Sequence, residues 1–355
     1  MTIHIITEPE YSQSTWYTSI EKSIAEHAMH KRIKIKHETG SFSAKSDDAV
    51  VIIGSGSDWI YNSVNKSKCT QPAPVILISN KPYDLTVNNI CTDLYSAMQD
   101  VISYLEKCGK TKTALFGINP SSQTDKVRLN SFKNEKDVYH SYGDLMSCCQ
   151  TFLENIDKYD SVICANDFAA ISLLNYLKKY DPAAIDRLYI VSFGDFRIAE
   201  LYSPAITSVS NNYNDYGTAL IELLPFLIKN KNIGYISLNI KSKIVVRETT
   251  GNTTFIPSES FSEKEAKAST DFYNDYEIKM LLKTEKFLNY SDEKDISIIK
   301  SLLDGNSYEK TAELHYFSVN GIKYRLKRIC DTCGFESVKE LLTLINGSSI
   351  GDRII

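Results

Sequence analysis

The sequence predicts an α/β protein that carries a small all-α domain at its C-terminal end. Residues 1–250 alternate short apolar runs with amphipathic segments of about 10–15 residues, which is the pattern of parallel sheets built from βαβ units. The region from Ser291 to Ile345 instead contains short amphipathic helices. At 355 residues the chain exceeds one ordinary domain and fits two or three.

The predicted elements of the α/β part follow from these apolar runs and periodicities. The runs rich in β-branched residues predict strands at Ile3–Thr7, Ile33–Ile35, Ala49–Ile53, Val75–Ile78, Thr113–Phe116, Ser161–Cys164 and Leu188–Ser192. The segments with a helical repeat predict helices at Trp16–Met29, Leu94–Lys107, Val127–Phe132, Leu145–Ile156, Phe168–Tyr180 and Tyr216–Ile228. Ligands of such sheets bind beyond the carboxyl ends of the strands.

The C-terminal region predicts three helices followed by a fourth. Ser291 is the expected N-cap of the first helix, which Gly305 ends in a left-handed conformation. A second helix is expected from Ser307 to Leu314. A third is expected from Val319 to Asp331, with Ser318 as its N-cap.

The third helix has one apolar side and one basic side. The cations are Lys323, Arg325, Lys327 and Arg328, and no acid lies between Gly321 and Cys330. Two short helices, a tight turn and a basic third helix form a pattern that enters the DNA major groove. The alternative is a solvated basic helix face, which is common.

The order of residues in this region resembles the LuxR-type helix-turn-helix over some 50 residues. The similar segments are Leu302–Gly305, Ala312–Glu313, Ser318–Lys323, Arg328–Ile329 and Gly334 with Glu340–Leu341. The resemblance implies DNA contacts from Lys323, Asn320 and Arg325, and it places Ser318, Tyr324, Lys327 and Arg328 in the same interface. His315, Tyr316 and Gly321 depart from the family pattern, which has a glycine where Tyr316 stands.

The α/β part resembles the effector-binding core of LacI-type regulators, which share the periplasmic sugar-binding fold. The similar segments are Asn119–Phe132, Val162–Ala170, Tyr189–Asp195 with Ser203–Pro204 and Thr207–Val209, and Ile244–Gly251. The resemblance implies two Rossmann-like lobes over residues 1–251. It implies three crossovers between them, expected near 108–112, 203–209 and 229–238, with a ligand in the cleft.

The resemblance also implies candidate ligand-binding residues. Arg128 is expected to fork hydrogen bonds onto a sugar, and Asn166 to donate and accept bonds to hydroxyls. Tyr11 and Trp16, in the loop after the first strand, are candidates for stacking on a sugar face. Gly194 stands where the family has a ligand-binding aspartate, so Asp195 is the candidate to replace it. The alternatives are a surface role for Arg128, a capping role for Asn166 and a core role for Trp16.

Two assignments concern residues outside the ligand set. Asp167 is expected to cap the helix that starts at Phe168. Residues 252–287 are polar and form either a connector helix that helps to pair two subunits or a loose tether, and residues 288–349 form the helix-turn-helix domain.

Charge, apolar runs and motifs limit the classes of function that the sequence allows. The net charge is −4, so any affinity for nucleic acid comes from a local patch. The sequence has no run of about 18 apolar residues and no basic, apolar leader at its start, so a cytoplasmic location without a membrane span is expected. No nucleophile elbow, metal-ligand cluster or nucleotide loop occurs, and Gly54–Ser57 lacks the ending of a phosphate loop. Neither enzymatic activity nor a cofactor or metal is therefore expected.

The cysteine pair Cys330 and Cys333 lacks the second ligand pair of a zinc site, and both residues are expected to pack in the core. Taken together, the sequence predicts a homodimeric transcription regulator. It would bind a DNA operator and sense a sugar-like small molecule. The alternatives are a periplasmic-type solute-binding protein and an interaction protein whose ligand site has degenerated, with Gly194 as the symptom.

Overall fold

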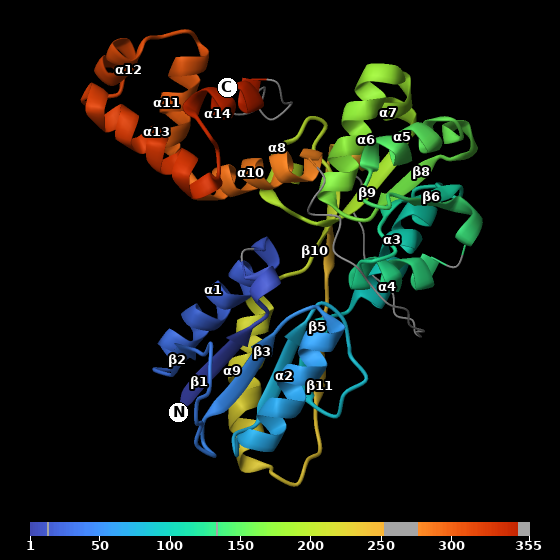
Figure 1. Cartoon of the computed structure of the whole chain (residues 1–355). Coiled ribbons are helices and arrows are strands. Elements are labelled where there is room, and N and C mark those ends of the chain that lie inside the picture. Colours follow the sequence, from blue (N-terminus) through green and yellow to red (C-terminus); the bar gives the residue numbers. More distant parts are fainter. Residues whose placement is uncertain (13, 133, 252–275, 347–355) are drawn as a thin grey trace.

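The computed structural model describes residues 1–12, 14–132, 134–251 and 276–346. Two α/β lobes lie one above the other, and a helical tail extends to one side of them (Figure 1). This is the periplasmic binding protein-like, two-lobed α/β fold with an additional all-α region that the sequence predicts.

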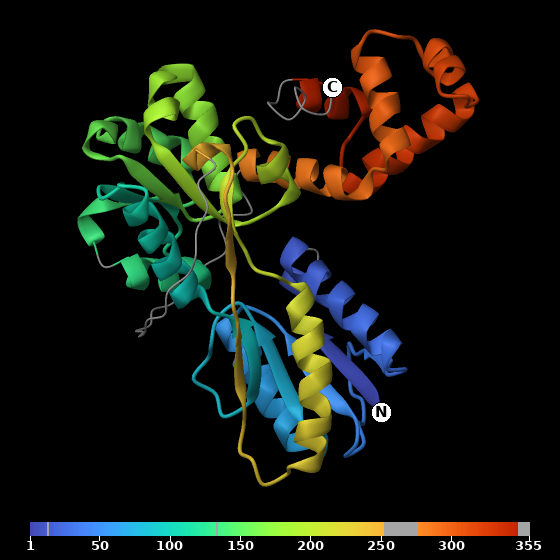
Figure 2. The same ribbon diagram turned by 180° about the vertical axis from the view of Figure 1, so that it is seen from behind.

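Lobe 1 is built on a parallel sheet in the order β11-β5-β4-β3-β1-β2. The strands are β1 (Thr2–Thr7), β2 (Lys34–His37), β3 (Ala49–Ile53), β4 (Val75–Ser79), β5 (Asn88–Thr92) and β11 (Ser237–Ile240). Alternate residues of β3 face opposite sides, and both sides are buried. Ala49, Val51 and Ile53 pack with α1 (Thr15–His30) and α9 (Asn214–Lys229), while Val50 and Ile52 pack with α2 (Ser57–Thr70). Figure 2 shows α1 and α9 side by side.

Lobe 2 has a second sheet in the order β12-β10-β9-β8-β6-β7. The strands are β6 (Thr113–Ile118), β7 (Val138–His140), β8 (Ser161–Cys164), β9 (Tyr189–Gly194), β10 (Thr207–Ser210) and β12 (Lys243–Val245), which runs antiparallel to β10. Helices α3 (Leu94–Lys107) and α4 (Gln123–Phe132) cover one face. Helices α5 (Leu145–Leu153) and α6 (Asp167–Tyr180) cover the other. Two short helices, α7 (Ala183–Arg187) and α8 (Arg197–Leu201), complete the lobe.

The chain crosses between the lobes at other positions than the sequence predicts. The crossovers lie at Asp93 between β5 and α3, at 211–213 between β10 and α9, and at 241–242 between β11 and β12. The positions near 108–112, 203–209 and 229–238 are therefore wrong. Periodicity identifies an apolar helix face but not the sheet that it covers. The buried face of α3 packs on β6 and β8 of lobe 2, so the first crossing precedes that helix.

The tail begins with α10 (Tyr276–Tyr290) and continues through α11 (Glu293–Leu303), α12 (Tyr308–Leu314), α13 (Val319–Cys333) and α14 (Val338–Asn346). Asp292, and not Ser291, is the N-cap of α11, because it forms a reciprocal capping box with Asp295. Ser318 caps α13 as predicted, and Ser307, which was expected to start the second helix, is the N-cap of α12. Cys330 and Cys333 are buried free thiols, as expected.

Helix α10 joins lobe 2 to the tail. Its described side chains pack against α8 and α6 on one side and against α13 and α14 on the other. Ile278, Phe287 and Leu288 are buried in one apolar cluster that extends from α6 into the tail. From Tyr276 onwards the segment is thus a helix and not a tether, whereas 252–275 lie outside the described residues. No described helix combines the length and the apolar character that a membrane crossing requires.

Tyr316, between α12 and α13, has a left-handed backbone with φ +58°. Gly305 and Gly334, with φ +85° and +82°, take the same region without a Cβ clash. The side chain of Tyr316 is 97% exposed, so packing does not offset the strain.

Replacing this tyrosine by glycine should stabilise the tail. We expect Tyr316→Gly to raise the free energy of tail opening by about 1 kcal/mol, measured by hydrogen exchange in α12 and α13. Tyr316→Ala is the control, since it also removes the ring but keeps the Cβ. Equal protection in the two variants would contradict the strain argument.

Candidate functional site

A cleft of about 920 Å³ lies between the two lobes. Lobe 1 contributes the segments after β1, β3 and β4, and lobe 2 contributes the segments after β6, β8 and β9. These are the carboxyl ends of parallel strands, where α/β folds bind ligands. Aromatic side chains line much of the cleft: Tyr11, Trp16, Trp59, Tyr61, Tyr83, Phe168, Phe193, Phe196 and Tyr213.

A buried carboxylate shapes the lobe 1 side. Glu8 Oε2 accepts hydrogen bonds from the backbone N–H groups of Ser55 (2.8 Å) and Gly56 (2.9 Å). Glu8 also leaves no space for a side chain at Gly56, because a Cβ there would lie 2.3 Å from Glu8 Oε1. The amides of Ser55 and Gly56 are therefore occupied by an internal carboxyl group, which argues against a phosphate loop at this position.

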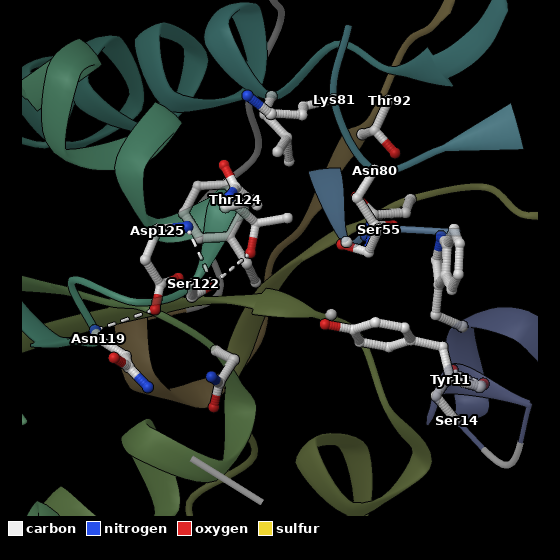
Figure 3. A pocket seen from close by; sticks show the side chains of 18 of the residues that line it. Tyr11, Ser14, Ser55, Asn80, Lys81, Thr92, Asn119, Ser122, Thr124 and Asp125 are labelled. Atoms are coloured by element: carbon white, nitrogen blue, oxygen red, sulfur yellow. Dashed lines mark hydrogen bonds between the residues drawn. The ribbon is translucent and has the colours of Figure 1, made fainter. Parts of the chain in front are cut away.

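Tyr11 and Trp16 both line the cleft, as the sequence predicts. Tyr11 closes a 3-10 turn (Pro9–Tyr11), and Figure 3 shows its hydroxyl extending into the space between Ser55 and Asn80 of lobe 1 and Ser122 of lobe 2. Trp16 lies in the first turn of α1 and packs partly into the core of lobe 1. Its ring N–H is buried and has no hydrogen-bond partner among the described residues. Because this atom is enclosed, a ligand oxygen reaches the donor only after the surrounding side chains shift.

Arg128 lines the opposite side on α4. Its Nη1 lies 2.7 Å from Oδ1 of Asp125, and both side chains are buried. Asp125 also accepts a bond from the backbone N–H of Asn119 at 3.1 Å. The guanidinium carbon lies 4.5 Å from the ring centre of Phe193. Arg128 Nε has no partner within the described part of the chain, so a donor remains for a ligand.

Asn166, and not Asp167, caps the helix that follows β8. Asn166 is the N-cap of α6, where its Oδ1 accepts from Ala169 N at 3.0 Å, and it also lines the cleft. Asp167 is therefore not the cap. It is fully buried and accepts hydrogen bonds from Ser192, from Ser208 at 2.6 Å and from Phe196 N at 2.7 Å. It fastens the cleft loop that follows β9.

Asp195 does not line the cleft, contrary to expectation. Its carboxylate lies 2.6 Å from Nη2 of Arg247, and its N–H donates to Ser208 at 2.9 Å. Gly194 and Asp195 have φ values of +129° and +53°, which turn this side chain away from the space. A Cβ at Gly194 would lie 3.1 Å from Asp167 Oδ2, so the buried Asp167 occupies the space beside this glycine.

Several cleft residues escaped sequence analysis, among them Glu8, Asn80, Lys81, Trp59, Tyr213 and Leu282. Asn80 and Lys81 directly follow β4, so the position after a predicted strand was their available signal. Leu282 belongs to α10, and no sequence pattern brings that helix to the cleft. No group of three metal-ligating side chains occurs among the described residues.

The candidate DNA-binding surface lies on α13. Asn320, Lys323, Tyr324 and Lys327 are exposed, and Ser318 is exposed although its Oγ accepts from Gly321 N. Lys323 Nζ lies 5.7 Å from the ring centre of Tyr308. These side chains remain the predicted contacts.

Two of the predicted basic contacts also form ion pairs within the tail. Arg325 Nη1 lies 2.6 Å from Oδ1 of the buried Asp295 and 3.2 Å from Oδ2 of Asp292. Arg328 Nη2 lies 3.5 Å from Asp295 Oδ2. Both acids come from the start of α11, so counting charges along α13 alone overestimated its free cations. The structure assigns these arginines to holding α13 on α11.

Comparisons with known proteins agree with the fold. Residues 104–250 match a family model described as a periplasmic binding protein-like domain. Catabolite control protein A of Staphylococcus epidermidis is 24% identical over 229 residues, which cover 61% of this chain and 68% of that protein. The matched relatives are regulators and not enzymes, in agreement with the prediction that this chain is no enzyme.

Solved structures with a similar fold agree with this. The transcription regulator CcpA of Lactococcus lactis has a TM-score of 0.55 and 19% identity, and the match covers 70% of this chain and 99% of that one. A transcriptional regulator CelR–cellobiose complex has a TM-score of 0.56 and 16% identity, covering 70% and 84%.

The buried Asp167 gives a testable pH dependence. Burial raises its pKa to about 7, although the bonds from Ser192, Ser208 and Phe196 favour the ionised form. An unfolded aspartate titrates near pH 4, so the folded state binds the extra proton between about pH 4 and 7. The stability that this proton contributes is complete below that range and is lost as the pH rises to about 7.

We therefore expect the free energy of unfolding of the natural protein, relative to Asp167→Asn, to fall by up to about 1.4 kcal/mol per pH unit between these limits. Urea unfolding at several pH values measures this difference. A constant difference between the two proteins would show that Asp167 is ionised throughout.

Proposed function

We propose that this protein is a DNA-binding transcription regulator that senses a sugar or sugar derivative in the cleft between its lobes. The observation that carries the proposal is the single helix α10, which packs both on lobe 2, one side of the cleft, and on the helical tail. Its partners would be an operator DNA and the effector. The protein would act as a homodimer in the cytoplasm.

The lining of the cleft suits a polyhydroxylated ligand. Aromatic faces such as those of Tyr11 and Trp16 pack against the C–H side of a sugar ring. Asn166, Arg128 and the Trp16 N–H supply hydrogen bonds to hydroxyls. Cellobiose is named in the complex of one structural neighbour, which supports this class of ligand without identifying it.

The tail suits a DNA duplex. The exposed face of α13 presents two lysines without an acid on the same helix before Asp331. Such a face neutralises phosphates, while the residues near the helix start, including Asn320, reach base edges. The resemblance of this segment to LuxR-type helix-turn-helix domains supports the same assignment.

Effector binding would change DNA affinity through the spacing of two tails in the dimer. A ligand achieves this only if it binds one arrangement of the lobes more tightly than another. Gly194, at the position of a family ligand aspartate, favours a second candidate, an interaction protein without an effector. A ligand screen separates the two candidates.

The screen is a thermal-shift measurement against pentoses, hexoses and sugar phosphates. At least one compound should raise the melting temperature, because ligand bound to the folded state stabilises it. Trp16→Phe keeps an aromatic ring but loses the five-membered ring of the indole with its N–H, so it should weaken that binding about fivefold to tenfold. If no compound shifts the natural protein, the degenerate alternative is correct.

DNA binding is tested at Lys323. We expect Lys323→Ala to weaken binding to a mixed-sequence duplex and to reduce the slope of log affinity against log salt by about one unit. Lys339→Ala, on the exposed side of α14, is the matched control because it removes the same charge outside α13. Equal slopes for the two variants would remove α13 from the interface.

A further inference from the structure

One residue that lines the cleft belongs to neither lobe. Leu282 comes from α10, and the other described lining residues come from positions 8–213. Leu282 is partly buried and packs against the same apolar cluster as Phe196, which also lines the cleft. The helix that starts the tail is therefore in contact with the cleft itself. Figure 1 shows α10 running from lobe 2 to the rest of the tail.

A buried carboxylate fixes α10 to lobe 2. Glu285 is 2% exposed, and its two oxygens accept the backbone N–H groups of Arg197 (3.1 Å) and Ile198 (2.7 Å). These are the first N–H groups of α8, which have no partner inside their helix. Asn289 also donates to Glu285 at 2.6 Å, and the guanidinium of Arg197 donates to the carbonyl of Leu288.

The two N–H groups that hold α10 come directly after the cleft loop in the chain. Phe196 is the residue before α8, lines the cleft and stacks on Phe168 with ring centres 5.1 Å apart. The N–H of Phe196 bonds Asp167, and the next two N–H groups bond Glu285. A displacement of Phe196 by a ligand would thus move the two donors that hold α10.

We propose that α10 is a third wall of the effector cleft, that Leu282 contacts the bound effector, and that Glu285 transmits movement of the cleft loop to the tail. This proposal rests on the proposed function for its biological role and deepens it. It replaces a purely indirect effect of lobe closure by a direct contact between effector and tail. The connection runs through hydrogen-bonded and packed groups, from Phe196 through Arg197 and Ile198 to α10.

The anchor is tested by hydrogen–deuterium exchange on the full chain. Glu285→Gln keeps the shape but presents an amide N–H₂ to a backbone donor. We expect about fivefold to tenfold faster exchange in residues 196–201, as for the loss of a buried cap, with faster exchange also in α13. Lys283→Met is the control, because it breaks the 2.7 Å pair with Glu340 on the tail side of the same helix and leaves α8 untouched.

Exchange in β3 and β4 of lobe 1 serves as the internal reference. Faster exchange there in Glu285→Gln would indicate general destabilisation and would overturn the proposal, as would unchanged exchange in residues 196–201. If residues 196–201 respond but α13 does not, Glu285 anchors α10 without transmitting to the tail, and the proposal fails at that step.

The role of α10 as a wall of the cleft is tested by acrylamide quenching of tryptophan fluorescence. The chain has two tryptophans, and both Trp16 and Trp59 line the cleft. Leu282→Ala should increase the Stern–Volmer quenching constant, because it opens the cleft on the α10 side. Leu281→Ala, the neighbour that does not line the cleft, should leave quenching unchanged, and Leu282→Met should restore the natural value.

Equal Stern–Volmer constants for Leu281→Ala and Leu282→Ala would contradict the proposal that α10 forms a wall of the cleft. Neither experiment requires an effector or an operator. A failure of Lys323→Ala to alter DNA binding therefore contradicts the proposed function alone, and a failure of the exchange or quenching result contradicts the role of α10 alone.

Discussion

The apolar packing on both sides of α10 is the constraint on which the arrangement of the molecule depends. Ile278, Phe287 and Leu288 are buried between lobe 2 and the tail, and each such side chain stabilises the joined state by about 1.5–3 kcal/mol. A polar helix at this position would leave the tail free to rotate. The buried Glu285 fixes the orientation of the helix as well, because its two oxygens match two specific N–H groups of α8.

The cleft is formed by polar groups that mostly satisfy one another. Glu8 holds the loop after β3, and Asp167 holds the loop after β9. The donors left over are few, and among the described residues they include Trp16 Nε1 and Arg128 Nε. A ligand that fails to meet these buried donors leaves them unpaired.

Local sequence signals predicted the elements well, and their long-range partners poorly. Ser307 and Ser318 cap their helices because capping depends on neighbours three residues away. Arg325 pairs with Asp295, which lies on another helix 30 positions earlier in the chain, and no local pattern indicates this pair. Its contact with DNA stays a prediction. The crossover before α3 was missed for the same reason, since either sheet could have covered its apolar face.

In the candidate site, too, local signals were predicted from the sequence and long-range contacts were not. Tyr11, Trp16 and Asn166 follow strands or begin helices, whereas Arg128 lies within α4. The family resemblance indicated all four as cleft residues. Asp195 failed because two positive φ values redirect it, which no residue pattern announces. Leu282 reaches the cleft only through the packing of α10, and that packing depends on the folded lobe.

The central claim is that the state of the cleft and the DNA affinity of the tail are coupled. The most direct measurement is the affinity of the full chain for one DNA duplex at one salt concentration, with and without a saturating sugar that raises the melting temperature. If the cleft and the tail are coupled, the sugar changes the affinity for DNA, and the duplex changes the affinity for that sugar by the same factor. Identical DNA affinities in the two conditions would contradict it.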